Sequence, residues 1–275
     1  MRIVTADGIG LEATVAGSGP ALLLVHGFGG AKEDFADHVP ALACDHTVVT
    51  FDLRGHGDSD QPEDPAAYSL ERLADDILAV ADHFGFTGFR LLGHSMGGMV
   101  ARKVVLTAPD RVEALVMMDT TPGPVPGFDP ALLDMAADVA LNQGKSALKE
   151  LLDLAQPLTT PAYERIVEER PGFQEYVDSK WDRLSAVMWG SLARAMARQS
   201  DDLPALAATL SVPLLVLVGE QDGPFVVASH AMHEAIPDTT LVIIPGAGHS
   251  PQFENPDAWI EALSGFLATL PAPVR

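Results

Sequence analysis

Six short apolar segments, mostly separated by segments of helical length, constrain the fold of this 275-residue chain more than any other feature. Continuous apolar runs of this length are typical of strands that are buried on both faces. Helical spacing is clearest in residues 69–84, where apolar side chains recur along one stripe. The strand-like segments are residues 21–25, 47–51, 89–92, 114–118, 213–218 and 241–244.

A hairpin precedes the first of these segments. Residues 2–5 and 11–15 are strand-like and flank Asp7-Gly8, a dipeptide favoured in tight turns. The hairpin and the six segments together supply eight strands. Strands that alternate with helices form a mostly parallel sheet that is covered by helices. The sequence therefore predicts an α/β fold: a mostly parallel eight-stranded sheet flanked by helices.

One interval breaks this alternation. Residues 119–212 contain no convincing strand pattern, and several of their segments have helical character. A proline- and glycine-rich segment, residues 122–127, leads out of the sheet, and residues 201–204 lead back. We therefore predict a helical cap over residues 122–204, inserted before the seventh strand. The core domain then comprises residues 1–121 and 205–275; the alternative is a set of extra helices packed beside the sheet.

The sequence Gly93-His94-Ser95-Met96-Gly97-Gly98 joins a predicted strand to a predicted helix. Gly-x-Ser-x-Gly at such a junction is the pattern of a nucleophile elbow, a turn so tight that its flanks must be glycine. The serine is then held in a strained conformation with its hydroxyl exposed. The same pattern also arises by chance in glycine-rich turns, so its meaning depends on partners elsewhere in the chain.

A serine hydroxyl needs a base, and usually an acid that orients the base. We predict His249 as the base, because it follows the last apolar segment in a loop of small residues. Asp222 is the predicted acid, since it directly follows the segment 213–218 and so lies at the same sheet edge. Asp119, at the end of the preceding strand, is the alternative acid. Glu220 lies nearer its strand and is less suited to reach His249.

Acyl transfer also needs donors for the oxyanion that forms at the attacked carbonyl. Residues 26–30, His-Gly-Phe-Gly-Gly, follow the first buried strand, and their glycines allow close approach to a substrate. We predict the backbone N–H groups of Phe28 and Met96 as the donors. The loop does not match a phosphate-binding loop, because Lys32 stands where a third glycine is needed and no Gly-Lys-Ser/Thr follows.

These motifs together resemble the α/β-hydrolase family over the whole chain, apart from the cap, which varies in that family. The resemblance rests on His26-Gly27-Phe28-Gly29, Asp52-Leu53-Arg54-Gly55-His56-Gly57-Asp58-Ser59, Gly93–Gly98, Asp222 and Gly248-His249. It implies that residues 52–59 form a structural turn beside the site, and that His26 and His94 are supporting hydrogen-bond partners. Dehalogenases and epoxide hydrolases of this fold carry aspartate where this chain has Ser95.

The resemblance is to the esterase and lactonase branch of the family. It implies a serine hydrolase that cleaves carboxylic ester bonds of small acyl esters or lactones, acyl-homoserine lactones among them, through an acyl-enzyme intermediate. Three cap residues, Trp181, Met188 and Trp189, are candidates for an apolar substrate pocket. The open alternatives are a C–C bond hydrolase, an acyltransferase or a perhydrolase with the same triad, and a receptor-like binding protein with a vestigial triad.

Composition limits the partners. The net charge of −21 disfavours binding to nucleic acids and anionic membranes. The sequence contains no run of 18 apolar residues, so it does not predict a membrane span. The single cysteine, Cys44, and the absence of a signal-peptide core suggest a soluble, cytoplasmic protein. We expect a small-molecule substrate, a monomer or homodimer, and no cofactor or metal. The pair His230 and His233 fits an exposed helix face better than a metal site.

Overall fold

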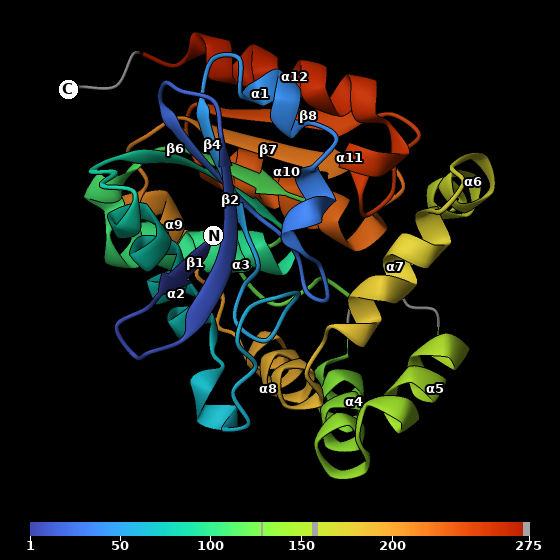
Figure 1. Ribbon diagram of the computed structural model, residues 1–275. Helices are drawn as coiled ribbons and strands as arrows, with labels where there is room; N and C mark the ends of the chain where they lie inside the picture. Colours follow the sequence, from blue (N-terminus) through green and yellow to red (C-terminus); the bar gives the residue numbers. More distant parts are fainter. Residues whose placement is uncertain (128, 156–158, 272–275) are drawn as a thin grey trace.

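The computed structural model describes residues 1–127, 129–155 and 159–271 and contains one eight-stranded sheet (Figure 1). The strands lie in the order β1-β2-β4-β3-β5-β6-β7-β8. Strands β1 and β2 pair antiparallel, β2 pairs antiparallel with β4, and the remaining neighbours are parallel. The predicted fold class is confirmed. The bounds are β1 Arg2–Val4, β2 Gly10–Ala16, β3 Ala21–Val25, β4 Thr47–Phe51, β5 Phe89–His94, β6 Val112–Met118, β7 Leu214–Gly219 and β8 Thr239–Ile244.

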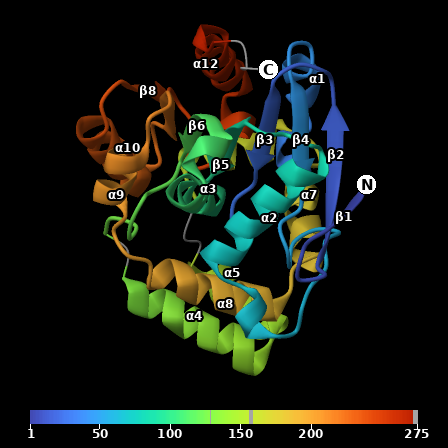
Figure 2. The ribbon, with the colours of Figure 1, turned by 90° about the vertical axis from the view of Figure 1, so that its left-hand side faces the viewer.

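Helices cover both faces of this sheet (Figure 2). In the central strand β3, Leu22 and Leu24 belong to the apolar cluster beneath α12, whereas Leu23 and Val25 belong to the larger cluster that includes α2 and α3. Because successive side chains of a strand point to opposite faces, a strand covered on both sides is apolar throughout. The helices and 3₁₀ turns that accompany the sheet are α1 Val39–Leu42, α2 Leu70–His83, α3 Met96–Thr107, α9 Leu203–Thr209, α10 Gly223–Ala235, α11 Pro251–Glu254 and α12 Pro256–Thr269, with η1 Lys32–Phe35, η2 Pro65–Ala67 and η3 Pro109–Arg111.

Helix α2 shows how local sequence sets the ends of these elements. Its N-cap is Ser69, whose Oγ accepts a hydrogen bond from the Arg72 backbone N–H at 3.2 Å. Its C-cap is Phe84, and the next residue, Gly85, has φ +70°. The helix thus matches the stripe predicted over residues 69–84.

In the part of the chain that the structure describes, helices α4 to α9 lie between β6 and β7, and Figure 1 shows α4, α5, α7 and α8 beyond the ends of the strands. Helices α4 and α8 pack against each other. The division of the chain into a core domain and a cap stays a prediction, and α9, which begins at Leu203, already packs against α3 of the core. The helices before α9 are α4 Pro130–Gln143, α5 Lys145–Ala155, α6 Pro161–Glu169, α7 Phe173–Asp182 and α8 Ala186–Ala197.

The parallel strands β3, β5, β6, β7 and β8 all end at one edge of the sheet. The segments that follow four of them carry Phe28, Ser95, Asp222 and His249, so residues far apart in the sequence meet there. Among the residues that the structure describes, none of the helices combines the length and the apolar character that crossing a membrane requires.

Candidate active site

Ser95 lies between β5 and α3 in a backbone conformation that L-residues rarely adopt, with φ 53° and ψ −118°. The flanking glycines explain how the turn can be so tight. A Cβ atom on Gly93 would lie 2.3 Å from the Gly97 carbonyl oxygen, and one on Gly97 would lie 2.5 Å from the Val25 carbonyl oxygen. The elbow therefore presses helix α3 directly against β3, and its strain presents the serine hydroxyl at the edge of the sheet.

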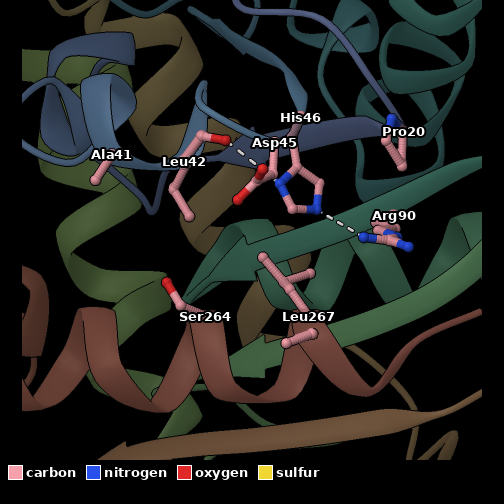
Figure 3. A pocket seen from close by; sticks show the side chains of 9 residues that line it. Pro20, Ala41, Leu42, Asp45, His46, Arg90, Ser264 and Leu267 are labelled. Atoms are coloured by element: carbon pink, nitrogen blue, oxygen red, sulfur yellow. Dashed lines mark hydrogen bonds between the residues drawn. The ribbon is translucent and has the colours of Figure 1, made fainter.

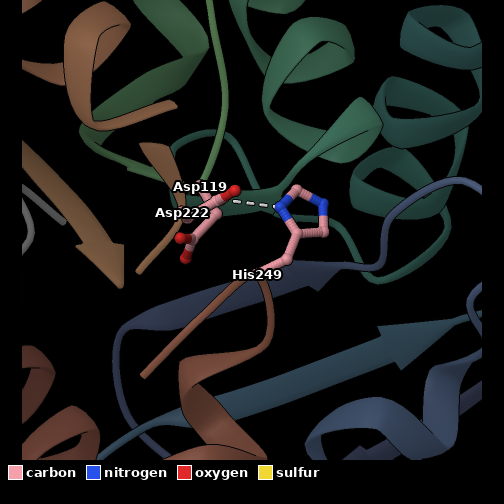
Figure 4. A group of neighbouring side chains, drawn as sticks. All are labelled: Asp119, Asp222 and His249. Atoms are coloured by element: carbon pink, nitrogen blue, oxygen red, sulfur yellow. Dashed lines mark hydrogen bonds and ion pairs between the residues drawn. The ribbon is translucent and has the colours of Figure 1, made fainter. Parts of the chain in front are cut away.

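The structure brings Ser95, His249 and Asp222 together. The Ser95 Oγ lies 3.0 Å from His249 Nε2, and His249 Nδ1 donates to Asp222 Oδ2 at 2.7 Å (Figure 4). Asp222 is the N-cap of α10, directly after β7, and His249 lies in the loop after β8. With Nδ1 as the donor to Asp222, Nε2 is free to accept the serine proton, which is the arrangement of a nucleophile, a base and an orienting acid.

Hydrogen bonds from neighbouring segments fix the loop that carries His249. The N–H groups of Gly248 and Ser250 donate to Glu254 Oε2 at 2.6 and 3.1 Å. His94, which precedes the nucleophile, donates from Nε2 to the His249 carbonyl oxygen at 2.7 Å. Glu220 also supports this loop, since its Oε2 accepts from the Gly246 N–H at 2.8 Å. These hydrogen bonds therefore fix the backbone on both sides of His249, from which the imidazole projects.

The backbone N–H groups of Phe28 and Met96 border the serine. Met96 begins α3, where the first N–H groups have no partner within the helix. Within the described ranges of the chain, neither N–H has a hydrogen-bond acceptor. Gly27 brings the two segments together, because a Cβ there would lie 3.1 Å from Ser95 Cβ. The two donors are thus available for an oxyanion, although that role stays a prediction.

Two buried histidines hold the loop of Phe28 in place. His26 Nδ1 donates to the Gly27 carbonyl oxygen at 2.8 Å, and its Nε2 accepts from the Leu53 N–H at 3.1 Å. His56 Nε2 accepts from the Gly29 N–H at 3.2 Å. Burial lowers the pKa of His26, and lowers the pKa of His56 to about 3. Both rings therefore stay neutral near pH 7 and act as acceptors, as neutral partners in the scaffold.

A cavity of about 410 Å³ opens onto Ser95 and His249. Its wall is mostly apolar and comes largely from helices between β6 and β7, with Asp34 and Lys180 as its two oppositely charged residues. The apolar side chains from α4, α5 and α8 are Leu132, Leu133, Met135, Ala136, Leu151, Leu152, Trp189 and Met196.

Of the three cap residues predicted to line a pocket, Trp189 alone does so among the residues described. Its ring packs on Phe28, with 5.1 Å between ring centroids. Met188 does not line this cavity: its side chain is fully buried against Gly55, on another side of α8. Trp181 packs against the core cluster and does not line the cavity, so a role in substrate binding stays a prediction for all three residues. The Met96 side chain is likewise buried in the core.

Sequence reasoning missed most of the cavity wall. Leu132 and Leu133 lie on α4, and the sequence there indicates a helix but not which of its apolar side chains face a cavity. Lys180 was not singled out at all, although it lines the cavity and donates to Asp34 Oδ1 at 2.8 Å. In the sequence, Lys180 is simply a lysine next to Trp181 in a predicted helical region. Such a pair is too common to indicate a site.

Asp119 lies beside Asp222 and His249, as Figure 4 shows. One ligand atom from each of Asp119, Asp222 and His249 lies within 4.8 Å of the others. Such a group of atoms has the spacing of a cation site, but the direct 2.7 Å hydrogen bond between Asp222 and His249 occupies two of them. That contact is the geometry of an oriented base. Asp119 is fully buried and its Oδ1 accepts from the Gly219 N–H at 2.8 Å.

A second cavity, of about 240 Å³, lies near the beginnings of the parallel strands (Figure 3). Arg90, near the start of β5, donates from Nη1 to His46 Nε2 at 2.6 Å in its wall. None of the predicted site residues lines this cavity. The candidate active site is therefore the cavity at the opposite ends of the strands, where Ser95 lies.

Comparison with known proteins agrees with this geometry. A family model described as the alpha/beta hydrolase fold matches residues 20–256. A putative 2-succinyl-6-hydroxy-2,4-cyclohexadiene-1-carboxylate synthase from Bacillus subtilis (strain 168) is 28% identical over 98% of this chain and 99% of its own. A solved hydrolase from Pseudomonas aeruginosa PA01 is similar with a TM-score of 0.85 at 26% identity, over 98% of each chain. A thermophilic esterase from Thermogutta terrifontis has a TM-score of 0.80 at 28% identity, over 98% of this chain and 97% of its own.

The elbow predicts a large cost for one added methyl group. Gly97→Ala places a Cβ within 2.6 Å of the carbonyl oxygens of Val25 and His26, which are backbone atoms. We expect the free energy of unfolding to fall by about 3 kcal/mol, at the upper end of the usual overpacking cost. Gly265→Ala is the control, because its Cβ meets no atom within 4 Å and alanine favours the helix. Equal stabilities in urea unfolding would contradict the packing argument.

The buried His56 predicts a dependence of stability on pH. Its pKa is lowered to about 3 from the ordinary 6.5, so between these values the unfolded chain binds a proton that the folded chain does not. The stability it confers is complete above pH 6.5 and is lost on acidification, by about 2 kcal/mol between pH 6.5 and 5.

His56→Gln is expected to remove that share of the pH dependence, as measured by urea unfolding at pH 5, 6 and 7. The control is His230→Gln, at an exposed position on α10. An undiminished pH dependence in His56→Gln would show that His56 is not held neutral.

Proposed function

The chain belongs to the alpha/beta hydrolase fold family, and on that premise we propose that it is a serine hydrolase that cleaves carboxylic esters of small acyl groups, or lactones. The observation that carries the proposal is the chain of hydrogen bonds from Ser95 Oγ through His249 to Asp222. A strained serine with a base at 3.0 Å is an activated nucleophile.

The proposed reaction has two halves. In the first, Ser95 Oγ attacks the ester carbonyl carbon while His249 Nε2 takes the hydroxyl proton, and the N–H groups of Phe28 and Met96 donate to the oxyanion. His249 then returns the proton to the leaving alcohol, and the acyl group stays on Ser95. In the second half His249 takes a proton from water, which attacks the acyl carbonyl, and the acid leaves as Ser95 regains its proton. Asp222 stabilises the imidazolium in both halves.

The cavity wall supports an apolar acyl group. Most of the side chains that face the cavity from α4, α5 and α8 are aliphatic, thioether or aromatic. Such a wall stabilises methylene groups of the substrate by roughly 0.8 kcal/mol each and offers little to a polar chain. The exposed Leu132 and Met135 extend this apolar surface outward. We therefore propose esters of aliphatic acids as the preferred substrates.

One observation favours a second candidate. The relative from Bacillus subtilis that matches nearly the whole chain carries the name of a synthase, not of an esterase. The same triad would then serve another reaction, such as C–C bond cleavage, acyl transfer or perhydrolysis. A fluorophosphonate would label Ser95 in either case, so only a comparison of substrates separates the two candidates.

A first prediction concerns the nucleophile. Wild-type protein should be labelled by a fluorophosphonate at Ser95 and should hydrolyse p-nitrophenyl esters or lactones. Ser95→Ala should lose the label and about 10⁴-fold or more of kcat, because the residual rate comes from binding and oxyanion stabilisation alone. Labelling of Ser95 with no turnover of any ester or lactone would favour the second candidate, and absence of the label would exclude serine catalysis.

A second prediction concerns acyl-chain length. For wild type, kcat/KM should rise roughly two- to fourfold per added methylene until the cavity is filled. Trp189→Ala removes an indole from the cavity wall and should shift the optimum to longer chains. Trp181→Ala is the matched control, since this indole lies in the same set of helices but not in the cavity wall. Identical chain-length profiles for the two variants would exclude Trp189 as a wall of the acyl pocket. Thermal unfolding would confirm that both variants are folded.

A further inference from the structure

Asp119 combines three features that the proposed mechanism does not use. It directly follows β6 with φ 46°, it is fully buried, and one of its two carboxyl oxygens has a clear donor. That oxygen, Oδ1, accepts from the Gly219 N–H at 2.8 Å. The other, Oδ2, is buried and has no hydrogen-bond donor among the residues that the structure describes. A buried carboxyl oxygen without a donor is costly unless it carries a proton and is itself a donor.

The charged groups around Asp119 are mainly acidic. A carboxyl oxygen of Asp222 lies within 4.8 Å of one of Asp119, and Glu254 from α11 adds a further negative charge nearby. His249 is grouped with the two aspartates and is already bound to Asp222, and His94, whose pKa burial lowers, lies beside His249. In the described part of the chain, no lysine or arginine forms an ion pair with Asp119 or Asp222.

Two neighbouring buried carboxyl groups do not both ionise near neutral pH. His249 Nδ1 donates to Asp222 Oδ2 at 2.7 Å, and an ionised carboxylate is a stronger acceptor than a protonated one, so this contact favours the negative charge on Asp222. Burial and the charge of Asp222 raise the pKa of Asp119 well above its ordinary value of 3.8. Geometry and electrostatics therefore both place the proton on the same carboxyl group.

We propose that Asp119 is a positioning residue: it keeps its proton at neutral pH and donates a hydrogen bond from Oδ2 to the Asp222 carboxylate. The Gly219 N–H and the Asp119 O–H then form a relay that fixes the orientation of Asp222 toward His249. The pair carries one negative charge, which matches the single positive charge of the imidazolium. The effect on reaction rate rests on the proposed function, whereas the location of the proton does not.

The first test observes the proton directly. The infrared difference spectrum of wild type minus Asp119→Asn at pH 7 should contain the carbonyl stretch of a protonated carboxyl group. Glu254, whose pKa burial also raises, is present in both proteins and cancels. A difference spectrum that contains only the bands of an ionised carboxylate would overturn the proposal, whatever the protein catalyses.

The second test measures positioning through the rate at which a fluorophosphonate labels Ser95. Asp119→Ala removes the donor and should slow labelling by about 10- to 100-fold, the range of one hydrogen bond to a charged group. Asp119→Asn should restore most of the rate, because its amide can accept from Gly219 and donate to Asp222 without a titratable proton. The wild-type rate should fall at alkaline pH as Asp119 ionises, and the Asp119→Asn rate should lack that fall.

Asp238→Ala is the matched control, because it replaces another aspartate with φ above zero, 57°, at an exposed position in the turn before β8. It reproduces the backbone cost of alanine without touching the triad. Equal labelling rates for Asp119→Ala and Asp238→Ala would overturn the positioning role. If Ser95 of wild type is not labelled at all while the protonated carboxyl band is present, the proposed function fails and the location of the proton stands.

Discussion

The contact between the nucleophile elbow and strand β3 is the constraint on which the rest of the site depends. Gly97 packs so closely on the carbonyl groups of Val25 and His26 that no side chain fits between them. This contact fixes the distance between the loop of Phe28 and the start of α3, which supply the two backbone N–H groups. Oxyanion donors are effective only when they are held in place before the charge develops. The strain at Ser95 is therefore maintained by packing that also preorganises its surroundings.

The turn of residues 52–59 helps to fix the position of the loop of Phe28. Lys32 bridges Asp52 and Asp58 at 2.8 Å each, and Asp52 is fully buried. These contacts hold the segment in which His56 accepts the Gly29 N–H. A buried ion pair contributes little to stability by itself, because desolvation offsets the attraction, but it restricts the geometry of its partners. The neutral ring of His56 is then a fixed acceptor that orients the loop of Phe28 without adding charge.

The parts of the site that depend on local sequence could be predicted, and those that depend on how a helix is rotated could not. Ser95, Asp222 and His249 each follow a buried strand, and parallel strands deliver their ends to one edge. Met188 and Trp189 are adjacent in α8 and point in different directions, one to Gly55 and one to the cavity. The sequence shows that both are apolar but not which of them faces the substrate side. The strand β5 also extends to His94, two residues past the predicted end, because it pairs with Met118 of β6.

Lys180 shows how the helices over the site become part of its chemistry. It extends from α7 to Asp34, which follows the loop of Phe28 and also accepts from the Ala31 N–H at 3.2 Å. Tyr176, one turn earlier in α7, donates to the same carboxylate. Because Asp34 is buried, breaking these contacts would leave an uncompensated charge, so they hold α7 against the loop of Phe28. A substrate that displaces α7 would thereby disturb the donors at Phe28, whereas one that fits beneath it leaves them in place. The contacts of Asp34 with Lys180 and Tyr176 thus link the helices around the apolar cavity to the segment that follows Phe28.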